Sequence, residues 1–258
     1  MLPHERVSAA LTKQGAGPRL VAFLTAGYPD PKTFLEVLRK VAQTADAVEI
    51  GVPFSDPMAD GVTIQRSSRQ AIQSGVSLRW ILAELARRDF ELAAPVLLMS
   101  YLNPLLAYGY EALAARAAEV GVAGFIVPDL PYEESGPFAA ALDPHGLALV
   151  QLVTPATPAE RLRMICAASQ GFVYAVTKTG ITGAGAGTAL PADLAAYLDT
   201  VKRASRLPVC AGFGVRDAKQ VQSIGAHADG VIVGSALVEA LERGEDPAKF
   251  LRSLRGQP

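Results

Sequence analysis

A single acidic residue interrupts one of the short apolar runs in this chain of 258 residues. Glu49 stands between Val48 and Ile50, so a strand over these residues carries a carboxyl group among apolar neighbours. A buried carboxyl group is unfavourable unless it is paired, hydrogen-bonded or protonated near neutral pH. Such a group is a candidate general acid and base. A structural glutamate, satisfied by the backbone or by a neighbouring strand, is the alternative interpretation.

Two aspartates follow in the loop after this run. We expect Asp60 at the same end of the strands as Glu49, where a second carboxylate orients a substrate or stabilises a developing positive charge. Asp56 stands beside Pro57, and loop aspartates next to proline or glycine commonly form turns. We therefore expect chemistry from Glu49 and Asp60 and a turn from Asp56.

Glycines in the last quarter of the chain indicate a phosphate site. Gly212-Phe213-Gly214 follows one short apolar run and Gly234-Ser235 follows the next, with Ser235 expected to cap a helix that begins at Ala236. Free backbone N–H groups and the helix dipole favour an anion at such a place. The alternative is that these glycines only turn the chain and cap a helix. Their occurrence after the last two runs favours phosphate.

A third glycine-rich segment, Thr179–Gly187, lacks the lysine of a P-loop and does not indicate a nucleotide site. A lid over the substrate and a mobile surface connection both fit its composition. Lys178 directly precedes it and raises a rival chemistry, because a desolvated lysine forms a Schiff base with a carbonyl substrate. A solvated lysine at the rim is the alternative. The three histidines, His4, His145 and His227, are not expected near the site.

These residues are positioned by eight repeats of a short apolar run and a longer amphipathic stretch, the pattern of parallel strands joined by crossover helices. The chemically distinctive segments follow six different runs, whereas an open doubly wound sheet gathers its ligand loops at one switch point. We therefore predict an α/β fold, a (β/α)8 TIM barrel with an extra N-terminal helix. The predicted strands are Leu20–Leu24, Ala47–Ile50, Val96–Met99, Gly124–Val127, Leu147–Leu152, Gly171–Val176, Pro208–Cys210 and Gly230–Val233.

Start and stop signals place the helices. Asp30 is expected to cap a helix whose first residue is Pro31. Gly75 divides residues 63–89 into two helical pieces, and Gly121 is expected to end the helix before the fourth strand. The helix after Pro31 presents one apolar stripe to the barrel, formed by Phe34, Leu38, Val41 and Ala45.

Bulk properties exclude several classes of protein. The length and a hydrophobic content of 50% suit one domain over residues 1–258, and a net charge of −1 provides no basic surface for nucleic acid or an anionic membrane. Cys166 and Cys210 lack metal-site spacing, so we expect buried neutral thiols. No apolar run reaches membrane-spanning length and the N-terminal residues do not resemble a signal peptide, which favours a cytoplasmic protein.

Six blocks of the sequence resemble, in the same order, those of the tryptophan synthase alpha chain family. The longest and most specific is Glu49–Gly61. The resemblance spans nearly the whole chain. The other blocks are Phe23–Asp30, Leu98–Pro104, Pro128–Pro131, Thr179–Gly183 and Gly212–Gly214.

The resemblance implies a lyase of tryptophan biosynthesis that splits indole-3-glycerol phosphate into indole and glyceraldehyde 3-phosphate, with no metal or organic cofactor on this chain. It implies proton transfer by Glu49 and a contact of Asp60 with the indole N–H. Phosphate would rest on Gly183, Gly214, Gly234 and Ser235. The implied substrate-binding residues are Phe23, Tyr174, Thr182, Gly183, Phe213, Gly214, Ile232, Gly234 and Ser235.

The family resemblance also implies a partner, the tryptophan synthase beta chain, which carries pyridoxal phosphate, receives indole directly and forms an alpha2beta2 assembly. Docking is expected around Asp56–Met58 and Asn103–Leu106. The isolated chain would then be a weak enzyme that the partner activates. Two other hypotheses remain at this stage: a Schiff-base aldolase that uses Lys178, and a silent barrel that binds the phosphorylated indole only to regulate a partner.

Overall fold

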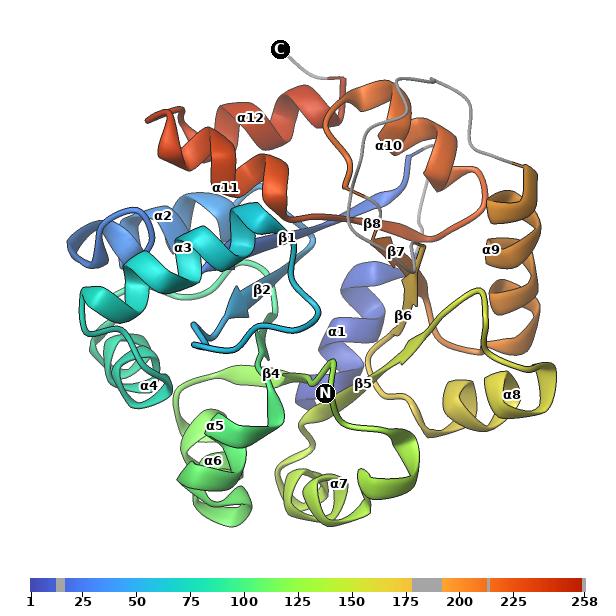
Figure 1. The fold of residues 1–258 in the computed structure, drawn as a ribbon, viewed down its shortest axis with the longest axis horizontal. Helices are drawn as coiled ribbons and strands as arrows, with labels where there is room; N and C mark the ends of the chain where they lie inside the picture. The colour runs from blue at the N-terminus through green and yellow to red at the C-terminus, as the bar shows by residue number, and fades with distance from the viewer. Residues whose placement is uncertain (13–16, 178–191, 213, 257–258) are drawn as a thin grey trace.

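The computed structural model describes residues 1–12, 17–177, 192–212 and 214–256. Its strands are parallel, each pairs with the next along the chain, and β1 pairs with β8, so the sheet closes into a barrel (Figure 1). This closure confirms the predicted (β/α)8 barrel and excludes the open doubly wound sheet. The strands are β1 Arg19–Thr25, β2 Ala47–Gly51, β3 Val96–Met99, β4 Val122–Ile126, β5 Ala148–Val153, β6 Val173–Val176, β7 Val209–Gly212 and β8 Gly230–Val233.

The helices surround the barrel, and none in the described part of the chain is long and apolar enough to cross a membrane. Short 3-10 turns are η1 Pro31–Thr33, η2 Tyr132–Glu134 and η3 Asp143–His145. The helices are α1 Pro3–Leu11, α2 Phe34–Ala42, α3 Val62–Gln73, α4 Leu78–Arg87, α5 Leu102–Tyr108, α6 Tyr110–Glu119, α7 Gly136–Leu142, α8 Ala159–Ala168, α9 Ala192–Ala204, α10 Ala218–Gly225, α11 Ser235–Glu242 and α12 Pro247–Leu254.

Most of the predicted boundaries agree with the structure. The helices α3 and α4 are separate, with Gly75 between them at φ +83°, and Gly121 follows α6 at φ +77°. Asp30 accepts the backbone N–H of Lys32, but the turn that it caps is the 3-10 turn η1, and α2 begins only at Phe34. The expected apolar stripe of this helix is buried along its length: Phe34, Leu38, Val41 and Ala45.

The fourth strand begins earlier than predicted. Gly124 was expected to mark its start, but the strand begins at Val122 and Gly124 lies inside it. A Cβ atom at this glycine would lie 2.5 Å from the backbone oxygen of Ala148 on β5. A close approach between neighbouring strands, rather than a turn, therefore explains this glycine.

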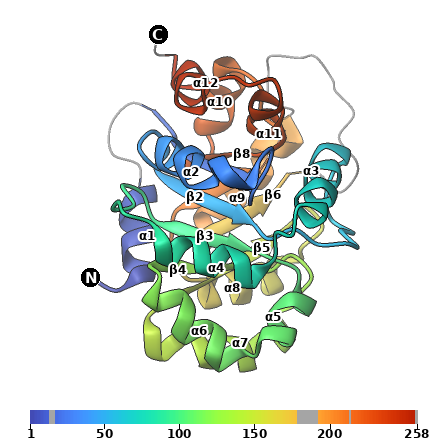
Figure 2. The ribbon, with the colours of Figure 1, turned by 90° about the vertical axis from the view of Figure 1, so that its left-hand side faces the viewer.

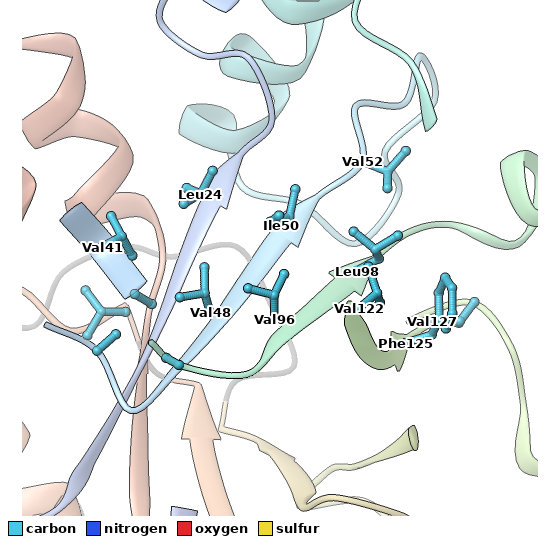
Figure 3. Packing of buried hydrophobic residues seen from close by; sticks show 14 of the residues in the cluster. Leu24, Val41, Val48, Ile50, Val52, Val96, Leu98, Val122, Phe125 and Val127 are labelled. Atoms are coloured by element: carbon cyan, nitrogen blue, oxygen red, sulfur yellow. The ribbon is translucent and has the colours of Figure 1, made fainter. Parts of the chain in front are cut away.

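Successive side chains of each strand belong to two apolar clusters, one between the strands and the helices and one inside the barrel. Outward residues such as Val48, Ile50 and Leu98 pack under the helices, in the cluster that also holds Val41 of α2 (Figure 3). Successive side chains of a strand point to opposite faces. Glu49, between Val48 and Ile50, therefore points into the barrel.

The helix α1 covers the N-terminal end of the barrel and confirms the predicted extra helix. Val7 and Leu11 are fully buried and belong to the same apolar cluster as Val21, Ala47 and Leu97 inside the barrel. Figure 2 shows α1 at one end of the barrel, opposite the end where the chain enters α3. A substrate therefore reaches the interior from the C-terminal ends of the strands.

Truncation of Leu11 should destabilise the barrel, because its side chain is fully buried where α1 meets the strands. We expect Leu11→Ala to lower the free energy of unfolding by roughly 2–5 kcal/mol. Leu2→Ala, at a half-exposed leucine beside the same helix, should change it by less than about 0.5 kcal/mol. Urea unfolding followed by circular dichroism measures both. Equal losses would mean that α1 does not seal the barrel.

Candidate active site

The carboxyl group of Glu49 is enclosed by the barrel. Glu49 on β2 pairs with Phe23 of β1 and with Leu97 of β3, and the residue is 0% exposed. Neither carboxyl oxygen has a hydrogen-bond partner among the described residues. Burial raises the pKa of Glu49 to about 8, since the low-dielectric interior disfavours the charged form. A structural glutamate satisfied by its neighbours does not match this environment.

Two glycines make room for aromatic rings around this carboxyl group. A Cβ atom at Gly51 would lie 2.4 Å from the ring of Phe23, and one at Gly212 would lie 2.7 Å from the hydroxyl oxygen of Tyr174. The side chains of Phe23 and Tyr174 therefore cross over the ends of the neighbouring strands. The pKa of Tyr174 is raised first by burial and then by the charges of Glu49 and Asp60, so the three groups lie near one another.

Asp60 lies in the loop that joins β2 to α3. Burial raises the pKa of its carboxyl group, and a hydrogen bond from the hydroxyl of Tyr101 partly offsets this rise. The same hydroxyl accepts the backbone N–H of Ala59 at 2.8 Å, and the ring of Tyr101 stacks on Phe54 with 5.1 Å between centroids. Tyr101, two residues after the end of β3, thus holds the loop of Asp60 in place.

A cavity of about 20 Å³ lies beside Asp60 at the ends of β1 to β4. A cavity of this size has room for about one water molecule. Its lining combines apolar side chains with the polar groups of Asp60 and Tyr101. The lining residues are Phe23, Gly51, Val52, Asp60, Ile64, Ser68, Met99, Ser100, Tyr101 and Pro128.

The loops after β7 and β8 offer backbone N–H groups to an anion. The helix α11 begins at Ser235 itself and Gly234 holds the N-cap position, so the prediction that Ser235 caps a helix from Ala236 is wrong by one residue. Because α11 begins at Ser235, the backbone N–H of Ser235 is one of the first amides of the helix, which have no acceptor within the helix. Gly214, at φ +61°, follows the neighbouring strand. An anion is favoured at such a helix N-terminus.

Residues 9–256 match the family model described as tryptophan synthase alpha chain. The chain belongs to the tryptophan synthase alpha chain family. The alpha chain of Desulfovibrio desulfuricans is 46% identical over 258 aligned residues, which cover 97% of this chain and 98% of that one. The alpha chain of Solidesulfovibrio magneticus is 43% identical over 92% of both chains.

Solved structures of the family agree with the fold. The crystal structure of tryptophan synthase subunit alpha from Legionella pneumophila has a TM-score of 0.86 at 32% identity and covers 99% of this chain and 98% of that chain. A structure of Mycobacterium tuberculosis tryptophan synthase has a TM-score of 0.85 at 36% identity, covering 98% and 95%.

Tryptophan synthase alpha chains are lyases that cleave indole-3-glycerol phosphate in tryptophan biosynthesis, and they work with a beta subunit. The family and the reaction that the sequence resemblance implied are therefore confirmed. The described part of the chain has no group of three or more His, Cys, Asp or Glu side chains that could hold a metal ion.

The structure brings most of the predicted tryptophan synthase site residues to one end of the barrel. Ile232 on β8 pairs with Gly212 and lies in the inner cluster against which Tyr174 packs. Phe23 is buried beside Gly51 and Gly234. Other predicted residues lie outside the described residues, namely Lys178, Thr182, Gly183, Phe213 and the remainder of the segment Thr179–Gly187.

Several residues lie apart from the site, as expected. The hydroxyl of Ser55 donates to the carboxylate of Asp56 at 2.6 Å, in a bend on the exposed rim just before the turn at residues 58–59. His4 bonds the backbone oxygen of Gly146, and His227 bonds Asp199. The predicted buried neutral thiols are also present: Cys166 and Cys210 are both buried and free, and burial raises the pKa of each.

Tyr101 and Gly51 are site residues that our sequence reasoning did not assign. Both stood inside blocks that resemble the family, but neither residue type signals a role without its spatial neighbours. A tyrosine directly after a strand is as compatible with packing as with a hydrogen bond to Asp60. Only the proximity of the two loops shows which residue the hydroxyl meets.

Glu49 makes the stability of the fold depend on pH. Its pKa of about 8 in the folded chain exceeds the value of about 4.3 for an unfolded glutamate. Between these values the folded state keeps a proton that the unfolded state has lost. Stability from this group is therefore full below the lower value and is lost as the pH rises to about 8. Relative to the parent, Glu49→Gln should gain on the order of 4 kcal/mol between about pH 5 and about pH 9.

Guanidinium unfolding of the parent and the Glu49→Gln chain at several pH values measures this difference. Glu111→Gln is the matched control, because Glu111 is exposed on α6 and the same substitution there should produce no comparable pH-dependent difference. A constant difference between the parent and Glu49→Gln across this pH range would contradict the assigned burial of an unpaired carboxyl group.

Proposed function

We propose that Glu49 and Asp60 carry out the cleavage of indole-3-glycerol phosphate in this chain, with Glu49 as the proton-transfer residue. The observation that carries the proposal is the enclosed Glu49 carboxyl group, which has no hydrogen-bond partner among the described residues and a pKa of about 8. Such a group holds a proton near neutral pH and still gives it up readily, as general acid and base catalysis requires.

The reaction follows from protonation of the indole ring. Glu49 donates its proton to C3 of the ring, which moves positive charge to the ring nitrogen. The bond from C3 to the glycerol carbon then breaks, and its electron pair neutralises the ring. The hydroxyl group on that carbon gives its proton to the Glu49 carboxylate and becomes the aldehyde of glyceraldehyde 3-phosphate, so Glu49 ends the reaction protonated. Because the protonated ring is itself the electron sink, this route requires no Schiff base at Lys178.

Asp60 has a different role in this proposal. Its carboxylate accepts the indole N–H and stabilises the positive charge on the ring nitrogen. The hydrogen bond of Tyr101 lowers the pKa of Asp60 against the effect of burial, whereas Glu49 has no such partner. Different surroundings thus assign the two carboxyl groups to different roles, one as a proton donor and one as an anion.

The substrate phosphate is proposed to bind at the loops after β7 and β8. Gly214, Gly234 and Ser235 supply backbone N–H groups there, at the start of α11. The family resemblance adds Gly183 to this site and Thr182 to the substrate-binding residues. Phe23, Tyr174, Phe213 and Ile232 are proposed as walls around the indole ring and the glycerol phosphate.

Replacement of Glu49 tests the proposed role. Glu49→Gln keeps the size of the side chain but has no proton to transfer, so indole release should fall by about 10²–10⁴-fold while the substrate still binds. A colorimetric assay of indole, with the beta chain present, measures turnover. Glu111→Gln is the control and should keep the parent rate.

Two outcomes would point elsewhere. Substantial turnover by Glu49→Gln would remove Glu49 from the mechanism, and loss of activity on borohydride treatment with substrate would support a Schiff base at Lys178. Binding of the substrate without turnover by the parent chain, even with the beta chain, would support the silent regulatory barrel.

We further propose an alpha2beta2 assembly with the beta chain, which carries the pyridoxal phosphate and receives indole directly. The loop after β2 presents Met58, which is 83% exposed, and α5 presents the exposed Leu106. A surface groove adjoins this loop and includes Phe54, Pro57 and Ile72. Exposed apolar surface of this kind is typical of a protein interface.

Met58 provides a test of this docking surface. With the beta chain present, we expect the parent chain to release indole faster than alone, and Met58→Asp to lose most of this activation because a charge would be buried in the interface. The rate without the partner should not change. Met164→Asp is the matched control, since Met164 is 47% exposed on α8. Equal activation of both variants would exclude Met58 from the interface.

We propose one domain over residues 1–258 and a cytoplasmic location. The first proposal is supported by the closed barrel, to which all the strands in the described part of the chain belong. The second is supported by the two free cysteines, which suit a reducing compartment, and by the biosynthetic role of the family.

A further inference from the structure

Glu239 on α11 joins three segments of the chain that lead away from the proposed site. Its Oε1 atom accepts the hydroxyl of Thr63 at 2.9 Å and a guanidinium N–H of Arg216 at 3.1 Å. Its Oε2 atom accepts the other terminal N–H group of Arg216 at 2.7 Å. One carboxylate therefore holds the start of α3, the loop after β7 and the helix α11 together.

Each of these segments carries a different part of the proposed substrate site. Thr63 follows Asp60 by three residues, and Arg216 follows Gly214 by two. Glu239 itself lies four residues after Ser235, about one helical turn along α11. The contacts of Glu239 thus connect the loop expected to hold the indole N–H with both loops expected to hold the phosphate.

The contacts are well suited to fix distances. Arg216 and Glu239 form a two-point pair, in which parallel N–H donors restrict the relative orientation of both groups. The Glu239 side chain is only 20% exposed. Its pKa is lowered chiefly by the hydrogen bond from Arg216, which keeps it charged. In Figure 1 α11 lies beside α3, as their contacts also show.

A second link between the same helices provides a comparison. Arg66 of α3 donates to Glu242 of α11 at 2.5 Å, one turn further along both helices. Glu242 is 41% exposed against 20% for Glu239, and among the described residues this pair has no contact with the loop after β7. It joins α3 to α11 just as Glu239 does, but it lies further from Asp60 along α3.

We propose that Glu239 is a positioning residue that sets the distance between the indole site at Asp60 and the phosphate site at Gly214 and Ser235. This inference rests on the proposed roles of those three residues. The substrate has its ring and its phosphate at opposite ends, with the breaking bond between them. A small displacement of one end moves that bond away from Glu49 even when each end still finds its own site, and a misplacement of about 1 Å costs ~10²-fold in rate.

The test compares the whole substrate with its separate halves. In Glu239→Ala, kcat/KM for indole-3-glycerol phosphate should fall by about tenfold or more. Inhibition constants for glycerol 3-phosphate and for indole, each measured as a competitor, should stay within about twofold of the parent values, because each probe fills only one end of the site. Thr63→Val should produce part of the same loss, and its effect should not add to that of Glu239→Ala, because the two side chains share one contact.

Glu242→Gln is the matched control, since it weakens the other link between α3 and α11. It should lower the melting temperature by no more than Glu239→Gln does, because its ion pair is more exposed, and should leave kcat/KM within about twofold of the parent value. If Glu239→Ala does not fold, Glu239→Gln and Thr63→Val carry the same comparison.

Three results separate this inference from the proposed function. If the Glu239 and Thr63 variants have the same kcat/KM as the parent chain, this inference is wrong and the proposed function is unaffected. Equal loss of affinity for the whole substrate and for glycerol 3-phosphate would also overturn it, since Glu239 would then only build the phosphate site. Unchanged turnover by Glu49→Gln would overturn the proposed function, whatever the Glu239 variants show.

Discussion

The enclosure of the Glu49 carboxyl group constrains the rest of this structure. A carboxyl group without a hydrogen-bond partner among the described residues stays neutral in a low-dielectric interior, and its pKa rises to about 8. The enclosure exists because α1 seals the far end of the barrel with Val7 and Leu11, below the layer of Glu49. The apolar interior of the barrel thus keeps the Glu49 carboxyl group away from water.

The same constraint explains the small residues at the ends of the strands. Phe23 and Tyr174 cover Glu49 from β1 and β6, and their rings occupy the space that side chains at Gly51 and Gly212 would take. Burial by these rings excludes water without supplying a hydrogen bond to the carboxyl group. Asp60, by contrast, accepts a hydrogen bond from the hydroxyl of Tyr101. The two carboxyl groups therefore differ in hydrogen bonding as well as in their place in the chain.

Much of the fold was predictable from the sequence, since it depends on local periodicity. Short apolar runs between longer amphipathic stretches located the strands, and Gly75 and Gly121 marked breaks because their backbone conformations favour glycine. One prediction failed because a contact between distant segments determined the outcome, and another was wrong by one residue at the start of a helix. Gly124 lies within a strand because β5 approaches it, and α11 begins at Ser235 rather than at Ala236.

The sequence by itself determined the barrel, the place of Glu49 within an apolar strand and the family, because the repeated apolar runs and the ordered blocks are properties of the chain read in one dimension. Only the tertiary structure decided that Glu49 has no partner within the described residues, that Tyr101 meets Asp60, and that Glu239 joins Thr63 to Arg216. These facts depend on residues up to 176 positions apart. Desolvation and side-chain hydrogen bonds arise from what surrounds a group in space, and no local pattern encodes that surrounding.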